Sequence, residues 1–348
     1  MIFKKQRPVV GLDLGSHTIK AVELETTPAG PRLVNVGVSE PLDEAIVDGE
    51  IIDRQMVVEA LRRLFETRHF KSRRVVSSVS GRAVIIKPIT MDRLGQQEAR
   101  QAIVWEAEQH VPYDVNDVVL DFEILDPQGE GKQMQVLLVA AKKDLVMSQA
   151  DLLREAGLTP VAVDVDSFAL QNAVEMNYTL DDKEMVTLVN VGAELTNINV
   201  VQNGRPLFTK DLQLGGNNVE EALQRKLGLT QSEAQAVVQG RSPSKPEHMD
   251  TLRAAFEPLS TGIERAASYI KTGAESEKID RIFLSGGCAR VEGLKAFLEE
   301  RHHVPVEVVN PMNRIPYDPA VFGTYDPESL APSLAVGIGL ALRSVGDK

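Results

Sequence analysis

The stretch Val9-Val10-Gly11-Leu12-Asp13-Leu14-Gly15-Ser16-His17-Thr18-Ile19-Lys20 is the most informative part of the sequence. Alternation through Val9–Leu14, and again through Thr18–Leu24, predicts a β-hairpin that turns at Gly15. Such a turn exposes backbone N–H groups, and glycine lets a phosphate approach them closely. Asp13 can hold Mg²⁺ directly or through water, while Lys20, across the hairpin, can place an ammonium group beside phosphates. A plain hairpin with a glycine turn is the alternative interpretation of the motif taken alone.

The same pattern returns in the second half of the chain. Residues 186–201 form an apolar strand, a turn at Gly192 and a second alternating strand. Aligning Gly192 with Gly15 aligns Asn190 with Asp13 and Asn197 with Lys20. This separation is too long for a solenoid repeat and instead indicates two similarly built domains that face each other. A third glycine turn, Ser285-Gly286-Gly287, follows another apolar strand.

Composition limits the function classes. The chain has 348 residues, enough for about two domains, and 50 acidic against 38 basic residues give a net charge of −12. Such a field repels a phosphate backbone, which argues against general nucleic-acid binding. Cys288 is the only cysteine, so a cysteine-ligated cluster within one chain is excluded, and we interpret Cys288 as a small filler. Phosphate-binding P-loop and Rossmann glycine motifs are absent from the matching contexts.

The pattern of apolar and polar residues changes over residues 82–159 and predicts a β-α-β-β-α unit inserted into the first domain. Trp105 lies on its polar helix, where it either anchors the core of the insert or contributes to a partner surface. After the insert, Asp166 either caps the following helix or orders a water near a phosphate. We interpret His17, in the first turn, as a solvent-facing residue.

At the family level, Gly11–Lys20 resembles the first phosphate loop of the actin/Hsp70/sugar-kinase superfamily, and residues 188–197 resemble its second. Phe283–Gly287 resembles the adenosine motif of that superfamily. The insert resembles the 1C subdomain of FtsA-like proteins. Three further stretches, Trp105–Asp114, Val139–Asp144 and Val163–Ala169, together with Leu214-Gly215-Gly216-Asn217, are similar to the PilM family of actin-like type IV pilus assembly proteins.

The resemblance implies an α/β actin-like fold: duplicated ribonuclease H-like domains, mixed sheets with helices on both faces, and a 1C insert. We therefore expect four subdomains. Their boundaries are 1–81 with 160–180 and 333–348 (1A), 82–159 (1C), 181–215 with 279–332 (2A), and 216–278 (2B).

The resemblance also implies that Mg²⁺ and ATP bind between the two halves. Asp13 would organise Mg²⁺, directly or through water, and Asp13 and Asp166 are the candidate catalytic acids. The nucleotide-binding residues would be Asp13, Gly15, Ser16, His17, Thr18, Lys20, Asn190, Gly192, Ala193, Glu194, Gly215, Gly216, Gly286 and Gly287. The family's second loop usually carries Asp-x-Gly, but here Asn190 keeps the acceptor oxygen and loses the charge. We therefore expect ATP binding with slow turnover.

The implied role is a cytoplasmic scaffold, peripheral at the inner membrane and tethered by a partner. The N-terminal peptide of PilN would bind in a groove between 1A and 1C, whose residues the sequence does not identify. PilB and PilC would be neighbours, and the chain would form a homo-oligomer or ring. The alternative is a small-molecule, sugar-type kinase of the same superfamily, against which the insert and Asn190 argue.

Overall fold

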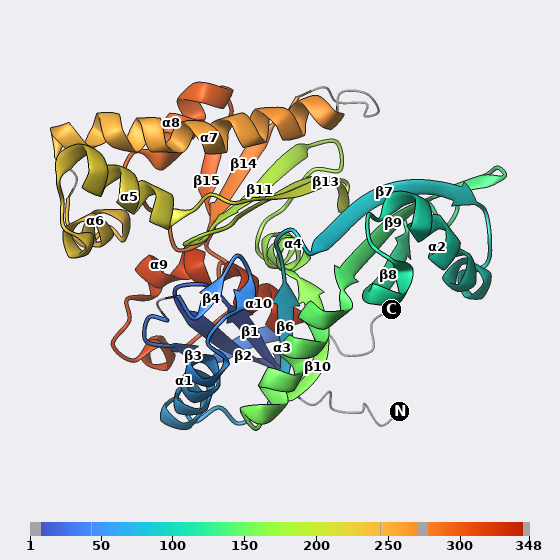
Figure 1. Ribbon diagram of the computed structural model, residues 1–348, viewed down its shortest axis with the longest axis horizontal. Coiled ribbons are helices and arrows are strands. Elements are labelled where there is room, and N and C mark those ends of the chain that lie inside the picture. Colours follow the sequence, from blue (N-terminus) through green and yellow to red (C-terminus); the bar gives the residue numbers. More distant parts are fainter. Residues whose placement is uncertain (1–7, 43, 244, 271–277, 344–348) are drawn as a thin grey trace.

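The computed structural model describes residues 8–42, 44–243, 245–270 and 278–343, in two lobes and a unit that projects from the first lobe (Figure 1). The first lobe is built on a five-stranded mixed sheet whose central strand forms the expected first hairpin with one of its neighbours. In order across the sheet, its strands are β10 (Thr159–Val165), β6 (Arg74–Val79), β1 (Val10–Leu14), β2 (Ile19–Thr27) and β3 (Gly30–Val38).

The second lobe repeats this sheet. Its strands are, in the corresponding order, β15 (Val306–Val308), β14 (Arg281–Ser285), β11 (Met185–Val191), β12 (Thr196–Gln202) and β13 (Arg205–Leu212). In both sheets two antiparallel pairings join the three consecutive strands, and two parallel pairings add the outer strands. The duplication expected from the repeated glycine hairpins is therefore confirmed.

Helices cover both faces of the first sheet. On one face lie α1 (Arg54–Thr67) and α3 (Lys143–Glu155), and on the other α4 (Asp166–Asn177) and α10 (Ala335–Leu342). The apolar side chains of α1 recur at helical spacing and are buried together, while Asp53 accepts a hydrogen bond from the Met56 N–H at its start. Leu170 and Val174 of α4 also pack against the second sheet. This helix therefore lies between the two sheets and joins the lobes.

The outer face of the second sheet is covered by a larger group of helices, namely α5 (Gly216–Leu227), α6 (Gln231–Val238), α7 (Pro246–Ile270) and α8 (Leu294–His302). Thr230 and Glu233 form a reciprocal capping box at the start of α6, where the sequence predicts one. The sequence predicts that the long helix reaches Thr272, and its last two residues lie outside the described part of the chain.

The insert is a three-stranded antiparallel sheet with one covering helix. Its elements are β7 (Val84–Asp92), α2 (Gln96–His110), the short 3₁₀ helix η1 (Val115–Asp117), β8 (Val118–Ile124) and β9 (Gln133–Lys142), and the strand order is β7-β9-β8. The predicted unit also includes the following helix, α3. However, Leu152 and Leu153 of α3 belong to the core of the first lobe, with Val57 and Leu61 of α1. We therefore propose that 1C ends near residue 142, because α3 buries its apolar stripe against the first sheet.

The packing of the segment after Val309 bears on the expected boundary of 2A. Met312, Ile315 and Phe322 pack with Val22 and Leu24 of the first sheet, although the sequence assigned them to the second lobe. The segment forms a parallel bridge to β3 and contains η2 (Pro319–Phe322), α9 (Pro327–Leu330) and η3 (Ala331–Leu334). We propose that it belongs to 1A. Residues 1–7 and 344–348 of the expected 1A subdomain lie outside the described residues.

A short hairpin, β4 (Ile46–Val47) and β5 (Glu50–Ile51), extends the first lobe toward the second. At its tip, the Asp48 N–H donates to the Glu194 carboxylate, and Gln213 donates to the Asp48 carboxylate. Within residues 8–42, 44–243, 245–270 and 278–343, no helix is both long and apolar enough to cross a bilayer.

Candidate functional site

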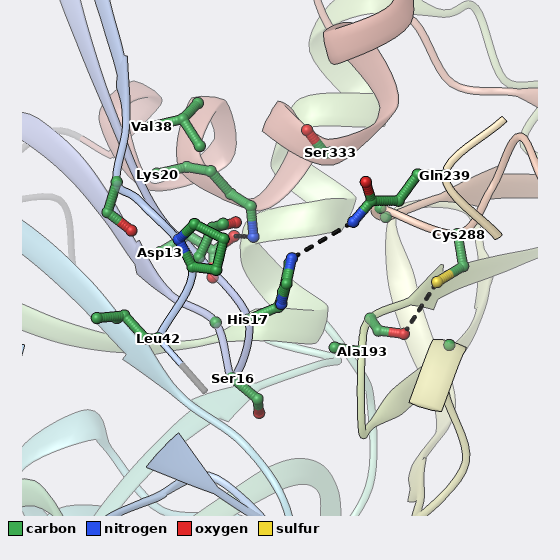
Figure 2. A pocket seen from close by; sticks show the side chains of 18 of the residues that line it. Asp13, Ser16, His17, Lys20, Val38, Leu42, Ala193, Gln239, Cys288 and Ser333 are labelled. Atoms are coloured by element: carbon green, nitrogen blue, oxygen red, sulfur yellow. Dashed lines mark hydrogen bonds and ion pairs between the residues drawn. The ribbon is translucent and has the colours of Figure 1, made fainter. Parts of the chain in front are cut away.

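A cavity of about 1850 Å³ lies between the two lobes, and its walls come from both (Figure 2). Of the nucleotide-site residues expected from the sequence, all but one line it: Asp13, Gly15, Ser16, His17, Thr18, Lys20, Asp166, Asn190, Gly192, Ala193, Glu194, Gly216, Gly286 and Gly287. Gly215 does not line the cavity. It packs behind it, since a Cβ at Gly215 would meet the Ala193 carbonyl oxygen at 2.4 Å.

The first glycine loop presents an ion pair to this cavity. Asp13 and Lys20 are directly opposite in the β1–β2 register, and Lys20 Nζ lies 3.2 Å from Asp13 Oδ2. Each side chain is only 15% exposed. The loop therefore offers an ammonium group, a carboxylate and the backbone of a tight turn at one place, which suits a Mg²⁺–polyphosphate ligand.

The second glycine loop has the same backbone and different chemistry. Asn190 and Asn197 occupy the matching register position in β11–β12, and Asn190 Nδ2 donates to Asn197 Oδ1 at 2.9 Å. The pair is uncharged. Glu194, expected to face the ligand, does line the cavity, but its carboxylate accepts from the Asp48 N–H of the other lobe. This contact ties the loop to the tip of β4–β5.

Asp166 is the first residue of α4 and does not cap it. The N-cap position is Val165, and the Asp166 carboxylate instead accepts a hydrogen bond from the Ser78 hydroxyl at the end of β6. Burial and the neighbouring charge of Asp13 raise the pKa of Asp166 to about 6, and hydrogen bonds from Ser78 and Ser80 oppose the shift. A carboxyl with this pKa can exchange a proton near neutral pH.

These two acids also bear on metal binding. A divalent cation between Asp13 and the phosphates of a ligand would offset the repulsion that Asp166 experiences, so the donor set fits Mg²⁺ held by Asp13 with phosphate oxygens and water. No group of three or more His, Cys, Asp or Glu side chains with metal-binding geometry occurs in the described part of the chain. The described residues alone therefore offer no complete cage, as is usual for Mg²⁺ sites shared with phosphate.

The third glycine turn closes the cavity on the side of the second lobe. Gly286 has φ +95°, and a Cβ there would meet the Val191 carbonyl oxygen at 2.3 Å, so the turn requires glycine. The Cys288 thiol lies 3.4 Å from the Gly192 carbonyl oxygen, to which it donates. Burial raises the pKa of Cys288 to about 12, which agrees with a packing role.

Some cavity residues, unlike His17, have no signal in the sequence. Gln239, after α6, and His17, in the first loop, approach across the cavity with Nε2 atoms 3.4 Å apart (Figure 2). His17 is thus a partly exposed cavity residue in contact with the other lobe, and the interpretation as a solvent-facing turn residue stays a prediction. Glu220, Gln235, Arg241 and Arg290 also line the cavity. They lie on helices and loops of the second lobe that carry no recognisable motif.

Trp105 lies outside this cavity. It is 69% exposed on α2, so it is not the core anchor of the insert. That core is built instead from buried residues of α2 such as Ala99, Ile103 and Ala107, packed against the sheet. The partner-surface alternative stays a prediction.

Comparisons with known proteins agree with this architecture. A family model described as "Type IV pilus assembly protein PilM" matches residues 11–345. A chain of a PilM–PilN type IV pilus biogenesis complex superposes with a TM-score of 0.87 at 27% identity, covering 98% of this chain and 100% of that one. MreB5 of Spiroplasma citri bound to ADP superposes with a TM-score of 0.55 at 11% identity, covering 96% and 95% of the two chains, which shows a shared fold.

Among relatives in sequence, the cell division protein FtsA of Escherichia coli K12 is 24% identical over 360 residues, covering 88% of this chain and 84% of FtsA. FtsA of Pseudomonas aeruginosa PAO1 is 23% identical over 386 residues, covering 96% and 88%. The expected actin-like fold and the resemblance to FtsA-like proteins are confirmed.

Proposed function

The chain belongs to the family of the type IV pilus assembly protein PilM, and from this premise we propose that it is an ATP-binding scaffold of the pilus assembly platform at the inner membrane. One observation carries the proposal. Two equivalent hairpins, one from each lobe, bring their glycine turns to the same cavity, and the first adds the Asp13–Lys20 ion pair. A cleft of this design suits a charged, two-ended ligand such as a nucleotide.

In this proposal the phosphates of ATP lie between the two glycine loops. Backbone N–H groups near Gly15 and Gly192 and the Lys20 ammonium would hold them, and Asp13 would hold Mg²⁺. Bound Mg²⁺ supplies neutralisation of the phosphate charge. The nucleoside would extend toward Gly216 and Gly286, which line the same cavity beside the second glycine loop.

Turnover is expected to be slow. Asn190 stands where the superfamily usually has an acid, and its amide is already bonded to Asn197. Among the candidate catalytic acids, Asp166 alone is left to act on a water. We expect phosphate release far below the roughly 1–100 s⁻¹ typical of kinases. A rate in that range would contradict the scaffold role and favour the kinase alternative.

The second part of the proposal concerns a peptide partner and rests on the insert. Helix α2 covers one face of the insert sheet, and the side chains of the other face form register rows that no helix of the insert covers. One row joins Ile86, Val139 and Asp121, and the next joins Val84, Ala141 and Val119. This face is largely apolar, as an extended peptide with apolar side chains requires.

Two further observations support this surface. Met147, on the helix that leads from the insert back to the first lobe, is 45% exposed. A cavity of about 510 Å³ lies beside Val84 and Ile86, at the base of the insert. The chain is similar to a chain of a PilM–PilN complex. We therefore propose that the N-terminal peptide of PilN binds at the junction between 1A and 1C. PilB, PilC and further copies of the chain would be neighbours, and the partner would hold the protein at the membrane.

The nucleotide part is tested by calorimetric titration of Mg-ATP into the wild type and Asp13→Ala, with phosphate release followed on the same samples. We expect micromolar or tighter binding in the wild type, loss of binding in the variant, and little release. No binding to the wild type would contradict the assignment of every residue of the nucleotide site.

The peptide part is tested with a fluorescent N-terminal peptide of PilN and two matched variants of the insert. Val119, on the uncovered face, is 42% exposed, and Val104, on the outer side of α2, is 39% exposed. We expect Val119→Asp to weaken peptide binding at least about tenfold, because a charge is desolvated there, and Val104→Asp to leave it unchanged. Equal effects of the two substitutions would contradict docking on this face.

A further inference from the structure

A continuous row of side-chain hydrogen bonds crosses the second lobe from the third glycine turn to the base of the insert. The Ser285 hydroxyl lies 3.4 Å from Asn190 Oδ1, and Asn190 Nδ2 donates to Asn197 Oδ1 at 2.9 Å. Asn197 Nδ2 donates to Asp211 Oδ1 at 2.8 Å. Finally, the Gly81 N–H of the first lobe donates to Asp211 Oδ2 at 2.5 Å. Three strands of the second sheet, β14, β11 and β12, are thereby joined through β13 to the other lobe.

The direction of this row is set by chemistry. A carboxylate only accepts hydrogen bonds, whereas an amide side chain donates at one end and accepts at the other. Because Asp211 receives the fixed Gly81 N–H on one oxygen, its second oxygen requires a donor from Asn197. Asn197 must then present its oxygen to Asn190, and Asn190 must present its nitrogen to Asn197. The acid at the end of the row thus determines how both amides are turned.

The row connects two distinct cavities. Asn190 and Asn197 line the interlobe cavity, whereas Gly81 and Asp211 line the smaller cavity at the base of the insert. Gly81 precedes β7 by only three residues. The Asp211 side chain is partly buried, so burial raises its pKa, and the hydrogen bonds from Asn197 and Gly81 oppose this shift by stabilising its charge. Removing any one member of the row should therefore lower the stability of the whole network.

We propose that Asp211 is a positioning residue that fixes the amide orientation of Asn190 and Asn197 and ties the second glycine loop to the base of the insert. A ligand in the interlobe cavity and a peptide on the insert then influence each other's binding. This second statement rests on the proposed function, whereas the first concerns the protein alone. It also gives Asn190 a reason to be an amide, since an acid there cannot donate to Asn197.

The test interchanges the amide at position 190 and the acid at position 211. In Asn190→Asp, Asn197 lies between two carboxylates and can satisfy only one of them through its amide nitrogen. In Asp211→Asn, the Gly81 N–H still requires an oxygen at position 211, so the amide nitrogen there faces Asn197 and both native amides must turn to keep the row paired. The double variant N190D/D211N again has one acid and two amides, now in the reverse direction: Asn197 donates to position 190 and accepts from position 211.

The readout is backbone hydrogen exchange of the segment around Gly81 in the full chain without ligand. We expect Asn190→Asp to speed this exchange about tenfold or more, because a hydrogen bond of the row is lost in the second lobe, where Asn197 can donate to only one of the two carboxylates. In the double variant we expect Gly81 exchange to slow again. On a logarithmic scale, at least half of the increase in rate caused by Asn190→Asp should be recovered. Asn218→Asp is the matched control. Asn218 uses only its oxygen, as the acceptor of the Gly215 N–H, so an acid replaces it without loss and Gly81 exchange stays at the wild-type rate.

Two outcomes would overturn the proposal: unchanged Gly81 exchange in Asn190→Asp, or exchange in the double variant as fast as in Asn190→Asp. A merely local role of Asp211 predicts that the double variant combines both defects, so rescue distinguishes the two. Thermal unfolding of each variant checks that the fold is kept.

A second arm measures the affinity of the PilN peptide with and without Mg-ATP. We expect a ratio of about fivefold or more in the wild type and a ratio near one in Asn190→Asp. If neither probe binds the wild type, the proposed function fails while the exchange experiment still decides the role of Asp211. If both bind with a ratio of one in the wild type, the coupling is refuted and the positioning role stands on exchange alone.

Discussion

The hairpins β1–β2 and β11–β12 share one backbone and differ in what they carry. In each, the residue two positions before the turn glycine faces the residue five positions after it. In the first hairpin this pair is Asp13 and Lys20, an ion pair beside the cavity. In the second it is Asn190 and Asn197, a neutral amide pair that continues into Asp211.

The difference shows how duplicated elements divide their roles. The backbone of the turn is the shared part, since a Cβ on Gly15 or on Gly192 would meet the carbonyl oxygen three residues further on at 2.9 Å in both cases. Charge at the first hairpin suits a charged ligand. Amides at the second suit a directional internal network, because an amide can donate and accept at once. We therefore propose that the first loop supplies the charged groups for a ligand and that the second connects the cleft to the rest of the protein.

The largest expected difference between the hairpins concerns ligand binding. Asp13→Ala removes the carboxylate that we propose organises Mg²⁺ and leaves Lys20 without its counter-ion, so we expect Mg-ATP affinity to fall at least about 100-fold. Asn190→Ala is the matched change in the second hairpin and should cost less than about tenfold. Calorimetry on both variants measures the contrast, and similar losses would remove the proposed division of roles.

The shared backbone is tested by adding a methyl group to each turn. Gly15→Ala and Gly192→Ala each force a Cβ against a carbonyl oxygen, so both should lower the free energy of unfolding by about 1–3 kcal/mol. Gly287→Ala is the control within the same cavity, since a Cβ there meets nothing within 4 Å. Urea unfolding compares the three, and a large loss in one hairpin with none in the other would show that the turns are not equivalent.

The pH dependence of stability at Asp166 tests how strongly the charge of Asp13, in the first hairpin, acts on a neighbouring carboxyl. Its pKa in the folded protein, about 6, is raised from the ordinary value of 3.8, so its contribution to stability is complete below pH 3.8 and is lost as pH rises through 6. Asp166→Asn keeps an acceptor for Ser78 without this loss. We expect the free energy of unfolding of the variant to equal that of the wild type near pH 4 and to be about 1–2 kcal/mol higher at pH 8. This difference is smaller than the full pKa shift implies, because the side chain still meets the cavity. Unfolding from pH 4 to 8 checks the profile, with exposed Asp121→Asn as the control. A constant difference across that range would contradict the assigned cause.

The smallest expected effect compares the residues that follow the two turns. Ile19 is a buried apolar residue of the first hairpin, and its counterpart Thr196 is equally buried but donates to the Leu214 carbonyl at 2.7 Å. Ile19→Val should cost about 1 kcal/mol through lost packing. Thr196→Val should cost about the same through the unpaired carbonyl, whereas Thr196→Ser keeps the hydroxyl and should restore part of the loss. Failure of the serine variant to recover stability would show that packing dominates at both sites.

The sequence was informative where the pattern is local. Alternation around glycine predicted both hairpins, and helical spacing predicted α1 and the long helix α7. Of the site residues that the resemblance implied, all but Gly215 line the cavity, and most of them lie on the three glycine turns. Residues such as Gln239 and Arg241 were missed, since they reach the cavity from elements with no motif of their own.

By itself, the sequence predicted two similarly built domains, because strand alternation and tight turns are local patterns, and its resemblance to known motifs implied the actin-like fold and the family. Only the tertiary structure decided which lobe each segment joins. The stripe of α3 and the segment after Val309 pack on the first sheet because apolar surface is buried wherever a complementary face lies near in space. The same holds for the row ending at Asp211: its members lie far apart in the chain, and the pleat and register of four strands bring their polar atoms within hydrogen-bonding distance.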